Sequence, residues 1–274
     1  MTATGEVRVG VGGWVFEPWR GVFYPKGLKQ ADELGYASRH VTSIEINSTY
    51  YSSQKPESFA KWAAATPEGF RFAVKASRFA TNRKVLGDGA ESIGKFLGQG
   101  ITELGDRLGP ILWQFMATKT FDPDDFDAFL KLLPAKQDGI ALSHVMEARN
   151  ATFADPAFVA LCRKHGVAIC VSENENYPLI ADVTADFVYA RLLMGSDEIE
   201  TGYPPVELDR WTRRFQAYAA GGVPADLAPV DAKAPPKAAR DVYAYVIHEG
   251  KVRAPRAAME FLARLYPDRF EKPA

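Results

Sequence analysis

Charged and amide side chains occupy alternate positions in several short apolar segments of this sequence. Glu45 lies between Ser43 and Asn47 at every second position, and isoleucines fill the two places between them. Because successive side chains of a β-strand point to opposite faces, the three polar groups share one face. Comparable segments carry Lys75, Gln114, Glu147 with Arg149, Arg191 and Tyr245. These residues are the candidates for a binding or catalytic site.

The charges of this set do not balance. Its acids are Glu45 and Glu147, and its bases are Lys75, Arg149 and Arg191, with Arg78 just beyond Lys75. A partly buried set with surplus positive charge favours a small anionic ligand that carries a phosphate or carboxylate group. The alternative is a closed network of ion pairs that fills the interior and binds nothing.

If the site is catalytic, acid–base hydrolysis or lyase chemistry is the expected class. Glu45 or Glu147 would act as the acid or base. Lys75 would act as a base or nucleophile with a lowered pKa, or stabilise developing negative charge together with the arginines.

Aromatic residues form a second cluster of candidates. Trp14, Phe16, Trp19, Phe23 and Tyr24 crowd one segment, and Tyr50 and Tyr51 follow Glu45 closely. Rings in such a loop can stack on a base, a sugar or another flat ligand, and Trp14 is the one we assign to ligand binding. They can equally pack against one another as a lid. The sequence does not choose between the two.

The elements that must position these residues alternate along the chain. Apolar and β-branched segments predict strands over residues 7–12, 42–47, 71–76, 111–115, 141–148, 168–172, 187–192 and 242–247. Amphipathic segments predict helices over residues 31–39, 56–65, 92–107, 123–133, 156–165, 207–219 and 255–265. Several of these helices have Pro at or near the first turn, where its missing N–H costs nothing.

Eight strands that are each followed by a crossover predict the α/β class. The expected architecture is one TIM-like (β/α)8 barrel that uses residues 1–274 as a single domain. Strand faces covered by helices must be apolar, so the polar faces point into the barrel. The ionisable residues lie late in their strands, at the end that carries the active site in this architecture.

A doubly wound nucleotide-binding sheet is the main rival fold. Its best cue is the run Gly10, Gly12 and Gly13, but Val15 occupies the place of the third glycine in the dinucleotide fingerprint. The segment 221–240 is rich in Pro, Ala and Gly. Since it precedes a strand that the barrel needs, we expect a long surface loop there rather than a linker.

Composition limits the partners and the compartment. Thirty-three Lys and Arg residues against 34 Asp and Glu residues give a net charge of −1. No global field therefore draws the protein to nucleic acid or to an anionic membrane. Cys162 and Cys170 form neither a CxxC pair nor a disulfide framework, so buried thiols are expected. The first residues lack the features of a signal peptide, and no apolar run spans a bilayer, so we expect a soluble cytoplasmic protein.

No cofactor or metal site is predicted. The histidines at positions 40, 144, 165 and 248 lack the HxH and HExxH spacings of zinc sites, and no GxSxG motif occurs. A single metal held by Glu45, Glu147, Glu173 and His248 is an alternative arrangement.

Ordered blocks of the sequence resemble the family of domain of unknown function 72, the YecE-like proteins. The blocks are residues 9–14, 19–25, 45–51, Trp62, 66–67, 70–76, 108–115, 147–149, 189–191 and 241–245. They are distributed along almost the whole chain, from residue 9 to residue 245, and the resemblance implies a TIM-barrel-like fold but no established reaction.

The chain departs from the pattern of this family at four places. Relatives tend to carry His or Asn where this sequence has Asn82, Asn150, Leu193 and Ile247. If the family pocket uses histidine for proton transfer or metal binding, this member is altered there or takes a different ligand. A catalytically silent scaffold is therefore one alternative function. A nucleic-acid-binding or DNA-repair-associated protein is another, since a barrel mouth can hold a flipped nucleotide, although the net charge disfavours it.

Overall fold

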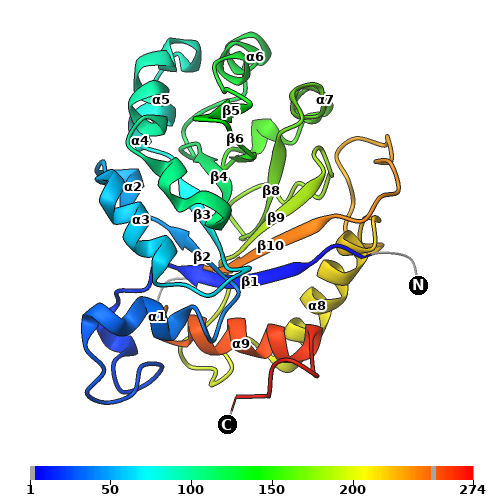
Figure 1. Ribbon diagram of the computed structural model, residues 1–274. Helices are drawn as coiled ribbons and strands as arrows, with labels where there is room; N and C mark the ends of the chain where they lie inside the picture. The colour runs from blue at the N-terminus through cyan, green and yellow to red at the C-terminus, as the bar shows by residue number, and fades with distance from the viewer. Residues whose placement is uncertain (1–3, 248–250, 274) are drawn as a thin grey trace.

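Eight parallel strands close into a barrel in the order β1-β10-β9-β8-β7-β4-β3-β2 (Figure 1). The computed structural model describes residues 4–247 and 251–273. The barrel strands are β1 (Val7–Gly12), β2 (Ser43–Ile46), β3 (Arg71–Lys75), β4 (Leu108–Gln114), β7 (His144–Glu147), β8 (Ala168–Glu173), β9 (Phe187–Leu192) and β10 (Asp241–Val246). The TIM-like (β/α)8 barrel predicted from the alternation of strands and helices is confirmed.

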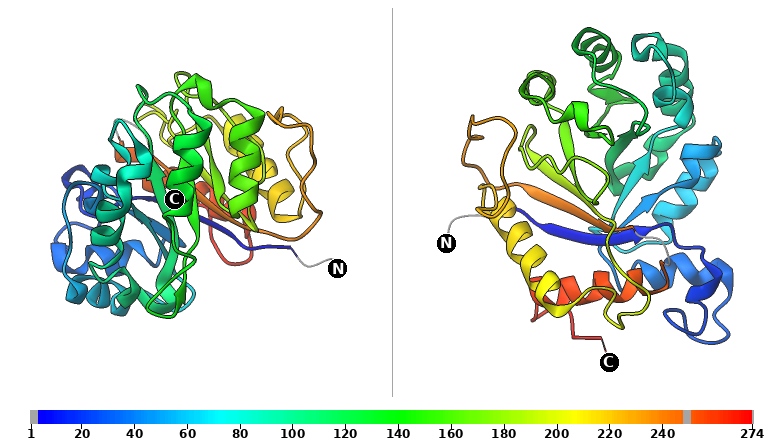
Figure 2. Two further views of the ribbon diagram at one scale, coloured as in Figure 1. Left: turned by 90° about the horizontal axis from the view of Figure 1, so that it is seen from above. Right: turned by 180° about the vertical axis from the view of Figure 1, so that it is seen from behind.

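Helices cover the outside of this barrel. The α-helices are α1 (Glu33–Ala37), α2 (Ser48–Tyr51), α3 (Pro56–Ala64), α4 (Arg78–Thr81), α5 (Ala90–Leu97), α6 (Pro123–Lys131), α7 (Pro156–His165), α8 (Pro205–Ala219) and α9 (Ala254–Leu265). Helices α8 and α9 pack together, and α9 lies against β1 (Figure 1 and Figure 2). The one-turn helices α2 and α4, which the sequence analysis did not predict, follow β2 and β3 directly. None of the helices in the described residues is both long and apolar enough to span a bilayer.

Two predicted elements are divided in the structure. The helix expected over residues 92–107 ends at Leu97, and a 3-10 segment, η4 (Ile101–Arg107), follows it. Gly100 lies between them with φ +98°, a conformation that interrupts a helix. The strand expected over residues 141–148 is reduced to β7, because residues 140–141 turn back in a hairpin. Its strands are β5 (Lys136–Gln137) and β6 (Ile140–Ala141). Asp138 and Gly139 both have positive φ, as the tight turn of a hairpin requires.

A layer of apolar and aromatic side chains fills the middle of the barrel. Val145, Cys170, Tyr189 and Tyr245 are buried in one cluster that faces the barrel axis. The rings of Tyr189 and Tyr245 lie 5.0 Å apart, and the Tyr245 hydroxyl is 2.6 Å from Ser43 Oγ. The barrel is therefore a packed core and not a channel. Cys162 and Cys170 are buried and unpaired, as predicted.

The segment between α8 and β10 is a long loop, as predicted, and contains no helix or strand. It extends along one side of the barrel, coloured yellow to orange in Figure 2. The loop is anchored by Asp182, which accepts hydrogen bonds from the backbone N–H groups of Val230 at 2.7 Å and Asp231 at 3.0 Å. The surface loop therefore packs on the barrel and does not separate two domains.

The glycine run of β1 has a packing reason. A Cβ atom at Gly10 would lie 1.8 Å from the carbonyl oxygen of Ser43 on β2. A Cβ atom at Gly12 would lie 2.7 Å from Ile247 Cδ1 and 2.9 Å from Asn47 Nδ2. Glycine at these positions lets β1 and β2 approach closely on the inner face of the barrel. The run therefore serves the barrel rather than a dinucleotide.

Substitution of Gly10 by Ala should test this close approach. Because the added methyl group would meet backbone rather than a movable side chain, we expect the free energy of unfolding to fall by about 3 kcal/mol. Gly94→Ala is the matched control, since Gly94 lies within α5 and nothing surrounds its Cβ position within 4 Å. That variant should be more stable by about 0.5–1 kcal/mol. Urea titrations measure both values, and equal stability of the two variants would contradict the packing described.

Candidate functional site

A buried arginine joins two glutamates from opposite sides of the barrel. Arg191 on β9 is only 2% exposed. Its Nε and Nη2 atoms donate to the two carboxylate oxygens of Glu45 on β2, at 3.1 and 3.0 Å. Its Nη1 atom donates to both oxygens of Glu147 on β7, at 3.0 and 2.9 Å. We call these three residues the Glu–Arg–Glu bridge.

Further donors hold the two carboxylates of the bridge. The Tyr189 hydroxyl donates to Glu45 Oε2 at 2.6 Å from the layer below. Gln114 Nε2 donates to Glu147 Oε2 at 2.7 Å, and Arg149 donates to Glu147 Oε1 from Nε at 3.1 Å and from Nη2 at 3.0 Å. Both carboxylates are fully buried, and this saturation with donors offsets the cost of burying them.

The pKa of Glu147 shows the effect of these donors. Burial raises this pKa, but Arg191, Arg149 and the Gln114 hydrogen bond outweigh burial and lower it to about 2. Burial lowers the pKa of Arg191, while the two carboxylates raise it well above its usual value. At neutral pH Glu147 is therefore an ionised and weakly basic group. This favours a positioning role for Glu147 over that of general base.

Lys75 differs from every other charged group of the site. It ends β3 with 8% of its surface exposed, and its Nζ atom forms no hydrogen bond or ion pair with the described residues. The Nζ atom lies 4.1 Å from the centre of the Tyr50 ring. Burial and the nearby positive charge of Arg191 lower the pKa of Lys75 to about 8, against the opposing effect of the two glutamates.

Two more cations lie toward solvent. The guanidinium of Arg149 stacks 4.7 Å from the ring of Tyr177, and its side chain is 21% exposed. No hydrogen bond of Arg149 Nη1 to another described residue is present. Arg78 begins α4, is exposed, and lies 5.4 Å from the Phe79 ring. Since Arg78 is exposed to water, the unpaired positive charge that is at least partly buried at the carboxyl ends of the strands is on Lys75 and the outer edge of Arg149.

The structure brings together most of the residues predicted from the strand pattern. The residues that meet at the carboxyl ends of the strands are Glu45, Lys75, Gln114, Glu147, Arg149 and Arg191. Asn47 lies beside them and donates from Nδ2 to the carbonyl oxygen of Glu45 at 3.3 Å. Tyr245 is completely buried in the layer beneath the bridge. It supports the site from below and has no access to a ligand.

Trp14 lies apart from this group. Its ring is 5.1 Å from Trp62 on α3 and 6.1 Å from Phe72 on β3, in the layer between strands and helices. Trp19, Phe23 and Tyr24 pack on one another and on Tyr36 of α1. These four rings therefore contact other aromatic side chains, and the assignment of Trp14 to ligand binding stays a prediction.

Tyr177 is the site residue that the sequence analysis missed. It lies in the irregular segment after β8, where no periodicity marks it as important. The only available signal was its position after a barrel strand, since loops at that end carry the functional residues of this architecture. Tyr50, which the sequence analysis placed near the mouth, does contact Lys75.

The positions where relatives carry His or Asn have structural contacts here. Asn82 donates to the Tyr50 hydroxyl at 3.3 Å, and its buried Oδ1 atom has no partner among the described residues. Asn150 accepts a hydrogen bond from the Thr152 backbone N–H at 3.0 Å and caps a 3-10 turn. Ile247 packs beside Gly12 at the mouth. His248 lies outside the described residues, and within them no three His, Cys, Asp or Glu side chains form a metal-binding group.

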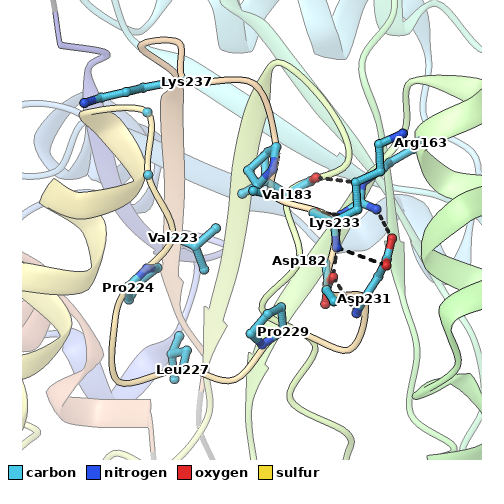
Figure 3. A pocket seen from close by; sticks show the side chains of 15 residues that line it. Arg163, Asp182, Val183, Val223, Pro224, Leu227, Pro229, Asp231, Lys233 and Lys237 are labelled. Atoms are coloured by element: carbon cyan, nitrogen blue, oxygen red, sulfur yellow. Dashed lines mark hydrogen bonds and ion pairs between the residues drawn. The ribbon is translucent and has the colours of Figure 1, made fainter.

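A cavity of about 420 Å³ lies apart from this site, under the long loop near the amino ends of β9 and β10 (Figure 3). Its charged lining residues are Arg163, Lys233, Lys237, Asp182 and Asp231. Arg163 forms ion pairs with Asp231 and, at 3.7 Å, with Asp182. The rest of its lining is mainly Val, Leu, Pro, Ala and Gly. This cavity therefore offers fewer reactive side chains than the carboxyl ends of the strands.

Comparison with known families identifies relatives. The family model described as "Protein of unknown function DUF72" matches residues 8–273. The UPF0759 protein YecE of Escherichia coli K12 is 28% identical over 142 residues, which are 50% of this chain and 48% of YecE. The match therefore spans about half the length of the curated relatives.

Solved structures share the architecture. A DUF72 family protein from Thermotoga maritima has a TM-score of 0.69 at 22% identity, covering 96% of this chain and 98% of that chain. A DUF72 family protein from Enterococcus faecalis has a TM-score of 0.69 at 16% identity, covering 95% and 98%. At these identities the likeness establishes the fold and no activity.

Removal of Arg191 should expose the importance of the bridge. Arg191→Met leaves two buried carboxylates short of their cation, so we expect the free energy of unfolding to fall by about 3–5 kcal/mol at pH 7. The defect should shrink as the pH falls toward 5, because the unpaired carboxylates then take up protons in the folded state. Arg210→Met on α8, which breaks a partly exposed pair with Glu207, should change stability by less than about 1 kcal/mol. Urea titrations at both pH values measure this, and a pH-independent defect would contradict the explanation.

Lys75 should reduce the stability of the fold. Because its pKa falls from 10.5 unfolded to about 8 folded, the charged amine is disfavoured in the native state. Lys75→Met should therefore raise the free energy of unfolding at pH 7, by roughly 1–3 kcal/mol. Between pH 8 and 10.5 the native protein has released this proton and the unfolded chain has not. In this pH range the free energy of unfolding of the wild type should rise, and the difference in this free energy between Lys75→Met and the wild type should become smaller.

Denaturation between pH 7 and 10.5 measures that narrowing. Lys131→Met is the control, because Lys131 is 63% exposed. It should show no comparable dependence on pH. A wild type more stable than Lys75→Met at pH 7 would show that Lys75 is stabilised where it lies.

Proposed function

Since the chain belongs to the DUF72 family, whose description names no activity, we propose its function from the site: the barrel mouth binds a small ligand through a carboxylate or phosphate group. The observation that carries this proposal is the Lys75 amine, which is buried at the end of β3 without a hydrogen-bonding or ionic partner among the described residues. A buried cation without a partner is costly, and such groups concentrate at binding sites.

The charge distribution supports an anion rather than a cation as the ligand. Glu45 and Glu147 are saturated by Arg191, Arg149, Tyr189 and Gln114. No acidic group of the bridge is left to bind a positive ligand. What remains available is the Lys75 ammonium and the Nη1 edge of Arg149. Charge-assisted hydrogen bonds from these donors to a carboxylate or phosphate are among the stronger polar interactions in proteins.

Two tyrosines prearrange the donors. Tyr50 lies under the Lys75 ammonium at 4.1 Å, and Tyr177 lies under the Arg149 guanidinium at 4.7 Å. The ring faces hold the cations by cation–π attraction without neutralising their charge. Ordering a long side chain before the ligand arrives reduces the entropy lost on binding. A closed network of ion pairs, the alternative interpretation of these charges, would leave no such cation.

If the site catalyses a reaction, Lys75 is better suited than the glutamates to exchange a proton. Its pKa of about 8 is near neutrality, whereas Glu147, with a pKa of about 2, stays ionised. A group whose pKa lies near the working pH is an effective acid or base. Hydrolase or lyase chemistry centred on Lys75 is therefore the reaction class that this geometry favours.

Anion binding should depend on both available donors. Calorimetric titration with sulfate, which does not titrate in this range, and with lactate should detect binding to the wild type. Lys75→Met and Arg149→Met should each weaken it by about tenfold or more, since a hydrogen bond to a charged group contributes roughly 1.5–3 kcal/mol. Binding to the wild type should also weaken as the pH rises through about 8, because Lys75 loses its charge.

Two variants with the same chemical changes serve as controls. Lys131 and Arg210 are more exposed and lie on α6 and α8. Lys131→Met and Arg210→Met should therefore bind both anions like the wild type. Anion binding that survives the loss of Lys75 and of Arg149 would place the ligand elsewhere, and absence of binding to every anion would reject the proposal.

A further inference from the structure

We propose that the Lys75 amine forms a Schiff base with the carbonyl carbon of a 2-oxo acid whose carboxylate is held at the barrel mouth. This inference rests on the proposed anion site and adds a substrate class to it. It requires an amine that no acid neutralises, a cation nearby to hold the carboxylate, and surroundings that tolerate the positive charge of the product. The structure supplies all three.

The first requirement separates Lys75 from the lysines that are paired with acids, and its burial at the end of β3 separates it from the exposed ones. Several lysines in the described part of the chain are held in ion pairs with acids: Lys95, Lys119, Lys131 and Lys164. An ion pair holds the proton on the amine, and a protonated amine is not a nucleophile. Lys75 is instead buried, faces the barrel axis and contacts an aromatic ring.

The electrostatic surroundings of Lys75 increase the neutral fraction of its amine. With a pKa of about 8, half of the Lys75 amines are neutral at pH 8, whereas an ordinary lysine with a pKa of 10.5 would be roughly 0.3% neutral. Burial is the main cause, and the positive charge of Arg191 adds to it. This is the means by which proteins activate a lysine toward carbonyl groups.

The second requirement is met by Arg149. Its charge is near enough to contribute to the lowered pKa of Lys75. Two of its nitrogens are fixed on Glu147, and the ring of Tyr177 supports the guanidinium plane, so the free Nη1 edge has a defined direction. Lys75 on β3 and Arg149 after β7 lie at the same end of the barrel, with β4 between their strands, so a carboxylate bound by Arg149 would place the adjacent carbonyl carbon of a 2-oxo acid at the end of the barrel where Lys75 lies.

The chemical step needs no further reactant. The neutral Nζ atom attacks the carbonyl carbon, and the electron pair of the C=O bond moves to oxygen. Proton transfer from nitrogen to oxygen gives a carbinolamine. Solvent water then gives the hydroxyl oxygen a second proton, the C–O bond breaks with release of water, and the nitrogen lone pair forms the C=N bond of an iminium. Return of the nitrogen proton to solvent gives the neutral imine. Amine and carbonyl compound thus become imine and water, with no oxidation or reduction.

The third requirement concerns the protonated imine, which is a cation. It would replace the lysine ammonium above the face of Tyr50, which favours positive charge. Glu45 and Glu147 lie close enough to raise the pKa of the Lys75 amine, and the same attraction favours the iminium. A protonated imine withdraws electrons from the neighbouring carbon, which is the property that lyase chemistry requires.

Reductive trapping tests the imine directly. The protein is incubated at pH 8 with pyruvate, glyoxylate or 2-oxoglutarate and sodium cyanoborohydride, and intact mass and peptide masses are recorded. With pyruvate we expect a single addition of about 72 Da on Lys75, the mass of one pyruvate joined with loss of water and reduced. Acetone, which has the carbonyl group but no anion, should label at least about tenfold more slowly.

Matched variants separate the covalent step from binding. Lys75→Arg should not be labelled, because a guanidinium keeps the positive charge but does not form an imine. Lys251→Met should be labelled like the wild type. Lys251 is a suitable control because it also has a lowered pKa and lies 4.4 Å from an aromatic ring, that of Phe16, while burial lowers its pKa without a contribution from Arg191 or the two glutamates. Arg149→Met should be labelled at least about tenfold more slowly at low pyruvate concentration.

Each outcome decides one of the two proposals. Labelling that is absent, or that persists in Lys75→Arg, rejects the Schiff base. If sulfate and lactate nevertheless bind through Lys75 and Arg149, the anion site stands without it. If no anion binds and no 2-oxo acid labels the protein, both proposals fail. Circular dichroism confirms that each variant is folded.

Discussion

The shared use of one arginine by two buried glutamates is the interaction on which the rest of the barrel mouth depends. Arg191 binds Glu45 and Glu147 at once, across a barrel in which β2 and β7 are separated by β3 and β4. Fully buried carboxylates persist as charges only when they are paired and hydrogen bonded. The bridge therefore explains why Tyr189, Gln114 and Arg149 must take the positions they do. It also ties three strands together at the end where loops rather than helices cover the barrel.

The hydrogen bonds of the Glu–Arg–Glu bridge occupy both carboxylates, so only other groups of the site are free to bind a ligand. Because its two carboxylates are saturated, the surplus charge is positive and resides on Lys75 and on the outer edge of Arg149. Both are held on tyrosine rings, which fix a cation without neutralising it. A buried lysine without an acidic partner is expected to reduce the stability of a fold, and proteins commonly retain such residues at functional sites. The packed layer of Tyr245 and its neighbours beneath the bridge gives these groups a rigid floor.

The fold was largely predictable because its signals are local. Helix starts at prolines, the alternation within β2 and β9, and the glycines of β1 all reflect short-range geometry. The errors arose where a few residues overrode a longer pattern. Gly100, with its positive φ, ended a helix that the apolar periodicity would have continued, and the Asp138–Gly139 turn converted part of a predicted strand into a hairpin. Membership of the DUF72 family is consistent with the same barrel architecture, but it provides no information about the chemistry of the site.

The sequence by itself determined which side chains enter the barrel, since strand alternation and the need for an apolar outer face leave one choice for Glu45, Lys75, Glu147 and Arg191. The sequence could not determine which of these side chains form ion pairs with one another. Glu45 and Arg191 are 146 residues apart, and only closure of the barrel brings them within hydrogen-bonding distance. Only the tertiary structure shows that Tyr177 contacts the guanidinium of Arg149 and that Trp14 packs between the strands and the helices. Ion pairing depends on the distances between strands in the closed barrel. The alternation of residues along a strand shows which face a side chain occupies, but it contains no information about those distances.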